Sequence, residues 1–342
     1  MTKQYVDRLI DEVGLPQAAR QCRVAAILFT YRCSIQCRHC LFSCAGDRPD
    51  VAMTPRQCAD GLAMLHETGR AIHIAGGEAM LYWDALAASV RLADEEGHAP
   101  HFIETNCSFA VDDEIVHERF DFLAAHGVKG LLASADPFHQ EFVPADRFLR
   151  VRRIAKEIFG AQNFYGSGRD DAEIEALQQV TGDEVRLRDH VRTHPPNLVG
   201  TAQQRLSRYL DGFTPYDSGV PRKGWGGGSG QDANCAREFA ADTMWELHID
   251  PYDNIQTNCG MVLGKTTEIS PASLLAEGPD RANRFVKAVC EGGAVGLAEL
   301  ARRDYGFTMP EQVSQSCELC YLTRRFLRQR HPDVFGPAEV YA

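Results

Sequence analysis

The stretch VAAILFTYRCSIQCRHC, residues 24–40, joins an apolar run directly to three closely spaced cysteines. The apolar residues 24–29 have the length and composition of a buried β-strand. Cys33, Cys37 and Cys40 follow as C-x-x-x-C-x-x-C, which places them in a loop at the carboxyl end of that strand. Three thiolates in one loop can hold three irons of a four-iron cluster, so that the fourth iron is free to bind another ligand.

Composition limits the class of protein. With 342 residues, the chain should form one large core with a smaller part appended. Its 36 basic and 47 acidic residues give a formal net charge of −11, which argues against a nucleic-acid partner. We find no apolar stretch near the roughly 20 residues of a membrane span and no signal-like N-terminus, so we expect a cytoplasmic protein without a membrane partner. The 12 cysteines then favour metal ligation over disulfides.

Strand and helix patterns alternate along the first part of the chain. We expect strands at 23–30, 71–75, 101–104, 128–134, 162–166 and 185–191. We expect helices at 4–21, 55–69, 84–97, 112–126 and 145–159. This alternation predicts an α/β fold with a parallel sheet, in which ligands bind where the carboxyl ends of the strands converge.

The composition and the sequence pattern change at residue 216. Residues 216–234 are dense in glycine and proline, which is typical of a linker. Residues 244–259, MWELHIDPYDNIQTNC, alternate apolar and polar side chains around a tight turn and predict a β-hairpin. Helical patterns at 271–304 and 321–330 follow. We therefore expect an N-terminal helix (1–22), a barrel (23–215), a linker (216–234) and a small C-terminal domain (235–342).

Two motifs together resemble the radical S-adenosylmethionine (SAM) superfamily. They are the three-cysteine loop and Gly76-Gly77-Glu78 after the second strand, and the resemblance covers about residues 20–200. It implies a partial (β/α)6 TIM-like barrel, a [4Fe-4S] cluster on Cys33, Cys37 and Cys40, and SAM on the open iron. In this family an electron from the cluster cleaves SAM, and the resulting 5′-deoxyadenosyl radical takes a hydrogen atom from the substrate.

The resemblance also implies which strand ends bind SAM. Gly76 and Gly77 permit close backbone approach, and Glu78 places a negative charge beside the methionyl ammonium. His39 stands where the family has an aromatic residue, and it is expected to pack on the adenine. Thr105 and Asn106 resemble the family's T-N-G motif at the third strand end.

The fourth strand end carries a further set of site residues. Ser134 and Asp136 resemble the S-x-D motif that contacts the SAM ribose, and a turn-opening role for Asp136 is the alternative. Beyond them, His139 and Glu141 are either substrate contacts or ordinary surface residues. One arginine of the following basic run is expected to meet the SAM carboxylate, but the sequence does not select among Arg147, Arg150, Arg152 and Arg153.

Cys107 occupies the place where the family's T-N-G motif has its glycine. A thiol there could return a hydrogen atom to a substrate radical, so that the net reaction would be an epimerisation. The alternative is a buried packing residue, which is common for cysteine. We assign the packing role to Cys22, Cys58 and Cys290.

Four late cysteines resemble the SPASM and twitch domains of many radical SAM enzymes, which bind an auxiliary cluster. They are Cys235, Cys259, Cys317 and Cys320. Four thiolates complete one further [4Fe-4S] cluster, so we expect two clusters in all. Zinc is the alternative at both sites, with Cys44 near enough to complete the first set.

The resemblance implies an enzyme that modifies a peptide side chain or backbone, as in natural-product maturation. A radical SAM dehydrogenase or epimerase of a small molecule is the alternative, and a non-catalytic iron–sulfur electron carrier is a third hypothesis. The carrier would have closed clusters and would not cleave SAM. The basic last helix, with Arg324, Arg325, Arg328 and Arg330, could dock a flavodoxin or ferredoxin reductant or only complement the helix dipole.

Overall fold

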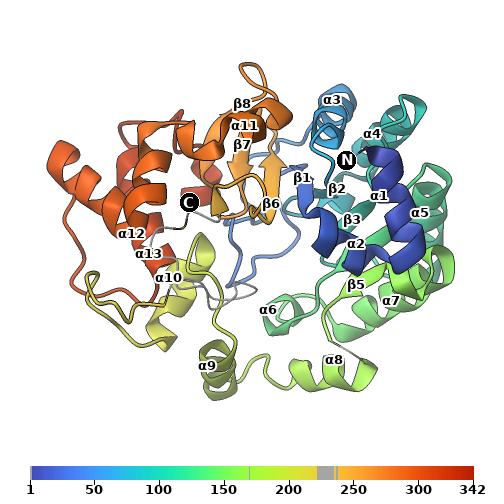
Figure 1. Ribbon diagram of the computed structural model, residues 1–342. Coiled ribbons are helices and arrows are strands. Elements are labelled where there is room, and N and C mark those ends of the chain that lie inside the picture. The colour runs from blue at the N-terminus through green and yellow to red at the C-terminus, as the bar shows by residue number, and fades with distance from the viewer. Residues whose placement is uncertain (1, 169, 222–234, 236–237) are drawn as a thin grey trace.

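The computed structural model describes residues 2–168, 170–221, 235 and 238–342 (Figure 1). Within these residues one sheet has eight strands in the order β5-β4-β3-β2-β1-β6-β7-β8. Strands β1 to β6 run parallel to one another, and β7 and β8 are antiparallel. The strands are β1 (Val24–Leu28), β2 (Ala71–Ala75), β3 (Phe102–Thr105), β4 (Gly130–Ala133), β5 (Phe164–Gly166), β6 (Glu246–Ile249), β7 (Asn254–Thr257) and β8 (Val262–Lys265).

Helices connect the strands and extend the fold beyond β8. The helices are α1 (Lys3–Val13), α2 (Leu15–Cys22), α3 (Pro55–His66), α4 (Trp83–Glu95), α5 (Asp113–Ala125), α6 (Pro137–Gln140), α7 (Ala145–Phe159), α8 (Asp171–Gln178), α9 (Glu184–Thr193), α10 (Thr201–Leu206), α11 (Pro271–Glu277), α12 (Arg284–Tyr305) and α13 (Ser316–Arg328). Short 3₁₀ helices are η1 (Ala79–Tyr82), η2 (Ala161–Asn163), η3 (Ser207–Tyr209), η5 (Pro279–Arg281) and η6 (Ala338–Tyr341). No helix in the described ranges has both the length and the apolar character needed to cross a membrane.

The two faces of the sheet have different neighbours. On one face α3 packs so closely that a Cβ added at Gly61 would lie 2.7 Å from Cδ1 of Ile27. We call the opposite face the inner face. At the amino ends of its strands, Val24, Ala71 and Phe102 share an apolar cluster with α1 and α2. These two helices therefore close the inner face at one end, and the loops at the carboxyl ends of the strands form the other end.

The α/β class and the parallel sheet are confirmed. In a sequential (β/α)6 arrangement the sixth strand would lie next to β5, but here the sixth parallel strand, β6, lies next to β1. The predicted hairpin is present as β6 and β7, with its turn at residues 250–253. Strand β6 pairs in parallel with β1, so the hairpin continues the barrel sheet. Local alternation predicted the hairpin, but the partner of β6 lies more than 200 residues earlier and leaves no local signal. Most of the expected linker, residues 222–234, lies outside the described residues.

The strand expected at 185–191 is wrong, because these residues belong to helix α9. Asp183 caps the helix by accepting hydrogen bonds from the backbone N–H groups of Val185 and Arg186. Leu187 and Val191, four residues apart, are buried, whereas Val185 is 58% exposed. The apolar period is therefore that of a helix.

Two other helix predictions need correction. The single N-terminal helix is two helices, which break at Gly14 with a φ of 81°. The last helix begins at Ser316 and not at residue 321, so Cys317 and Cys320 lie in its first turns.

Candidate active site

The three-cysteine loop leaves the carboxyl end of β1 and is held against the loop that follows β2. Gly77 N–H donates to the carbonyl of Thr30 at 2.7 Å, and Glu78 N–H donates to that of Arg32 at 3.1 Å. A Cβ at Gly77 would lie 2.1 Å from the Arg32 carbonyl oxygen and 3.1 Å from Cβ of Cys33. Any side chain at residue 77 would therefore push the cysteine loop away.

Glu78 is only 2% exposed and connects the ends of β2 and β3. Its carboxylate accepts hydrogen bonds from the Asn106 N–H at 2.7 Å, the Thr105 hydroxyl at 3.0 Å and the Met80 N–H at 3.1 Å. Burial raises the pKa of Glu78 to about 7, although these hydrogen bonds oppose the rise. Glu78 thus orders the strand ends themselves; its expected place beside the SAM ammonium stays a prediction.

Polar neighbours of Cys33 and Cys40 donate hydrogen bonds to their sulfurs. The side-chain amide of Asn106 donates to Sγ of Cys33 at 3.3 Å. The backbone N–H of Cys44 donates to Sγ of Cys40 at 3.3 Å. The Cys44 thiol, acting against burial, lowers the pKa of Cys40, whereas burial raises the pKa of Cys33. Such donors stabilise thiolates, which are the form of cysteine that binds metals.

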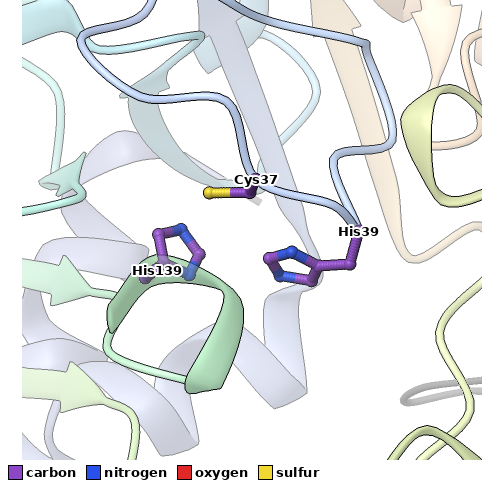
Figure 2. A group of neighbouring side chains, drawn as sticks. All are labelled: Cys37, His39 and His139. Atoms are coloured by element: carbon purple, nitrogen blue, oxygen red, sulfur yellow. The ribbon is translucent and has the colours of Figure 1, made fainter. Parts of the chain in front are cut away.

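Cys37 lies in a cluster with two histidines (Figure 2). One ligand atom each from Cys37, His39 and His139 lies within 4.8 Å of the others, and the three side chains point toward one another. Oδ2 of Asp136 accepts a hydrogen bond from Nδ1 of His139 at 2.7 Å and lies 3.2 Å from Nε2 of His39. The His39 ring stacks on Phe138 with ring centroids 4.6 Å apart.

Asp136 is consequently engaged within the protein. Its Oδ1 accepts hydrogen bonds from the backbone N–H groups of Phe138 and His139 and caps α6. Burial would raise the pKa of Asp136, but the charges of His139 and His39 outweigh it and hold that pKa well below its usual value. The ribose contacts expected of Asp136 and of Ser134, which follows β4, stay predictions.

A cavity of about 540 Å³ borders the cysteine loop at Ser34 and Ile35. Of the four arginines at 147–153, only Arg147 lines this cavity, and it donates a hydrogen bond to the carbonyl of Ser108. The other three pair with carboxylates elsewhere: Arg150 and Arg153 with Asp113, and Arg152 with Asp171. The structure thus distinguishes among arginines that the sequence treats alike.

Cys107 follows β3 in the left-handed backbone region, with a φ of 65°. Glycine adopts this conformation without strain, which gives a physical reason for glycine at this place in the T-N-G motif. The side chain is fully buried, burial raises its pKa well above the usual value, and it is not among the residues that line the cavity. The hydrogen-donor role of Cys107 stays a prediction that this position does not favour.

A buried arginine lies beside two of the late cysteines, Cys259 and Cys320. Arg324 of α13 is fully buried and donates to the carbonyl of Cys259 at 3.0 Å. Its guanidinium lies 5.9 Å from the ring centroids of both Tyr321 and Tyr341. Arg324 therefore cannot dock a partner protein, whereas Arg325 and Arg330 are exposed.

Arg324 has no carboxylate within ion-pair distance among the residues described, and its buried Nε has no hydrogen-bond partner there. An unpaired buried charge is costly, so a negative group is needed nearby. Burial lowers the pKa of Arg324, but Tyr341, Cys320 and Cys259 act in the opposite direction and raise it. A thiolate at Cys259 or Cys320 would supply such a negative charge, but among the described residues no three of the late cysteines lie close enough together to hold a metal ion. The second cluster therefore stays a prediction. The sequence signal for Arg324 was its position four residues after Cys320 on a helix.

This chain resembles known proteins in its structure and in one part of its sequence. A search of solved structures matches the crystal structure of BtrN in complex with AdoMet and 2-DOIA, at 13% identity and a TM-score of 0.44, over 80% of this chain and 89% of that chain. No curated protein matches. The family model described as the Radical SAM superfamily matches residues 27–161. This part of the chain, which contains the three-cysteine loop and Gly76-Gly77-Glu78, is thus a radical SAM superfamily domain.

Proposed function

We propose that this chain uses its radical SAM domain to take a hydrogen atom from a peptide side chain or backbone. The observation that carries the proposal is the loop of three thiols at the carboxyl end of β1, beside a cavity of about 540 Å³. A radical SAM domain implies an enzyme that cleaves SAM reductively. An electron carrier would gain nothing from an incompletely ligated iron.

Cys33, Cys37 and Cys40 would hold the [4Fe-4S] cluster. The cluster, with SAM bound, supplies one-electron cleavage of a carbon–sulfur bond to give the 5′-deoxyadenosyl radical. The protein's part is positioning: Asn106 and Cys44 donate hydrogen bonds to the ligand sulfurs, and Gly77 lets the loop pack closely. Arg147 is the arginine we assign to the SAM carboxylate, because it lines the cavity beside the loop.

A second [4Fe-4S] cluster would bind Cys235, Cys259, Cys317 and Cys320 in a SPASM- or twitch-like arrangement. The buried charge of Arg324 beside Cys259 supports it, because a tetrathiolate cluster supplies the missing negative charge. This cluster would accept an electron from the substrate radical or relay electrons. A flavodoxin or ferredoxin, being acidic, would dock at the exposed Arg325 and Arg330.

A small polar molecule is the second candidate substrate. The inner face of the sheet is closed at one end by α1 and α2, which suits a compact substrate better than a long chain. In that case the enzyme would be a dehydrogenase or an epimerase.

The test is anaerobic reconstitution followed by iron counting and incubation with SAM and dithionite. About eight irons per chain and formation of 5′-deoxyadenosine are expected. A variant with Cys33, Cys37 and Cys40 all replaced by alanine should keep about four irons and make no 5′-deoxyadenosine. Zinc in place of iron, or clusters without SAM cleavage, would refute the proposal. Candidate peptides and candidate small molecules are then incubated with the enzyme, and the compound whose mass changes is the substrate.

A further inference from the structure

Four ionisable side chains meet on the inner face of the sheet, beside the first cysteine loop, whose Phe42 packs edge-on against His248. His73 of β2 and His248 of β6 both pair in register with Ala26 of β1, so all three point to the same side. This side is opposite Ile27, which packs on α3. Glu246 lies two residues before His248, and Glu104 lies two residues after Phe102, the partner of His73 in register. Period-two alternation therefore places both carboxylates on the inner face as well.

These side chains form a connected polar group. Oε1 of Glu246 lies 2.8 Å from Nε2 of His73 and 3.2 Å from Nε2 of His248. Nδ1 of His73 lies 3.9 Å from Oε2 of Glu104, which is too long for a hydrogen bond. The Nδ1 atoms of both histidines are buried and have no hydrogen-bond partner in the described residues. Both rings are nearly inaccessible, at 2% and 3% exposure.

The inner face is open to solvent at Glu104 although it lies in the middle of the sheet. The Glu104 side chain is 38% exposed, and Tyr165, which is on the same face of β5, is also 38% exposed. Ile103 and Leu131, which face the helices from the neighbouring positions, are completely buried. An accessible space therefore lies over Glu104 between the end closed by α1 and α2 and the cysteine loop.

The two carboxylates in this space, Glu246 and Glu104, have different partners. Glu246 has two imidazole partners, and although burial opposes it, the charges of His248 and His73 lower the pKa of Glu246. Glu104 has no lysine or arginine partner in the described ranges, and its nearest basic atom is Nδ1 of His73. Burial raises the pKa of Glu104, although the charge of His73 opposes the rise. A cation bound beside Glu104 would supply the missing positive charge and favour the ionised carboxylate. Buried unpartnered nitrogen atoms beside it provide further hydrogen-bonding capacity for a ligand.

We propose that Glu104 binds a cationic group of the substrate, an ammonium or a guanidinium, on the inner face of the sheet. His73, Glu246 and His248 act as positioning residues behind it. The inference deepens the proposed function and rests on it, because it assigns a substrate class to the same enzyme. A lysine or arginine side chain of a peptide and the amine of an amino sugar share this chemistry.

Binding can be measured without turnover, on the iron-loaded protein with neither SAM nor reductant. The probes are two matched pairs: acetyl-Ala-Lys-Ala-amide against its norleucine counterpart, and glucosamine against glucose. In ligand-observed NMR titrations, the cationic member of at least one pair should bind roughly tenfold more tightly than its neutral partner. The pair that shows the preference identifies a peptide or an amino sugar as the source of the cation.

Glu104→Gln keeps the shape and removes the charge, so it should abolish the preference. The matched control is Glu157→Gln on the exposed face of α7, which should leave the preference intact. Equal binding of cationic and neutral probes in both pairs, or a preference that survives Glu104→Gln, would overturn the inference. Failure of the proposed function appears separately, as absence of 5′-deoxyadenosine with SAM and dithionite.

Discussion

Replacing Arg324 by methionine should affect the iron-loaded protein and the metal-free protein in different ways. Arg324 is fully buried beside Cys259 and Cys320, and it has no carboxylate partner in the described residues. In the metal-free protein the substitution removes a poorly compensated charge, so the free energy of unfolding should be unchanged or should rise by about 1–4 kcal/mol. In the iron-loaded protein the same substitution would remove the counter-charge of the proposed second cluster.

The magnitude for the loaded protein follows from electrostatics. Two unit charges about 5 Å apart, in an effective dielectric constant of about 20, interact by roughly 3 kcal/mol. For a one-electron couple this energy is on the order of 140 mV. Because Arg324 is a cation, it favours the reduced state, and its removal should lower the midpoint potential of the second cluster.

The assay is a redox titration followed by electron paramagnetic resonance, in a background where Cys33, Cys37 and Cys40 are alanines. Only the second cluster then contributes to the signal. Arg325→Met is the matched control, because Arg325 is the next residue on α13 and is exposed. The reasoning is refuted if the Arg324→Met potential equals that of the control, or if the metal-free protein loses several kcal/mol of stability.

Three further predictions concern the first site. The pKa of Glu78 is raised to about 7 in the folded protein, so between pH 4.5 and about 7 the unfolded chain ionises Glu78 while the folded protein does not. Over that range the free energy of unfolding of the parent should fall by roughly 3 kcal/mol relative to that of Glu78→Gln in urea titrations. Parallel curves of unfolding free energy against pH would contradict this. Arg147→Gln should weaken SAM binding by roughly tenfold in calorimetry, whereas Arg150→Gln should not, and equal effects would remove Arg147 from the SAM site. Cys44→Ala removes the thiol that lowers the pKa of Cys40, so iodoacetamide should alkylate Cys40 of the metal-free protein several-fold more slowly at pH 7; an unchanged rate would show that this hydrogen bond is unimportant.

Sequence patterns predicted five of the six expected barrel strands, because each of those predictions depends on neighbouring residues. Strand β2 and helix α7 have the expected bounds, and the cysteine loop follows β1 directly. Period-two and helical patterns are local properties of the chain. The pairing of β6 with β1 is not local, so the sequence assigned β6 to a separate domain.

Local sequence patterns likewise do not show which side chains of the candidate site pair with one another or are buried. The sequence identified Glu78 and Asp136 as polar residues at strand ends, but it could not show that their carboxylates already have protein donors. It also counted Arg324 among four basic residues of one helix. Burial separates Arg324 from the others, and burial depends on how α13 packs against the hairpin loop at Cys259.

The two cysteine sites have different electrostatic surroundings, and this difference bears on their chemistry. At the first site, Asn106 and Cys44 donate to the sulfurs as neutral groups, and the charge of His139 beside Cys37 is balanced by Asp136. At the second site, Arg324 lies beside Cys259 and has no carboxylate partner in the described residues. A nearby cation raises a reduction potential because it stabilises the added electron. On this basis the second centre should be the easier one to reduce. Electrons would then flow energetically downhill from the first site or from a substrate radical to the second, which suits the second centre to accepting an electron after the hydrogen atom is removed.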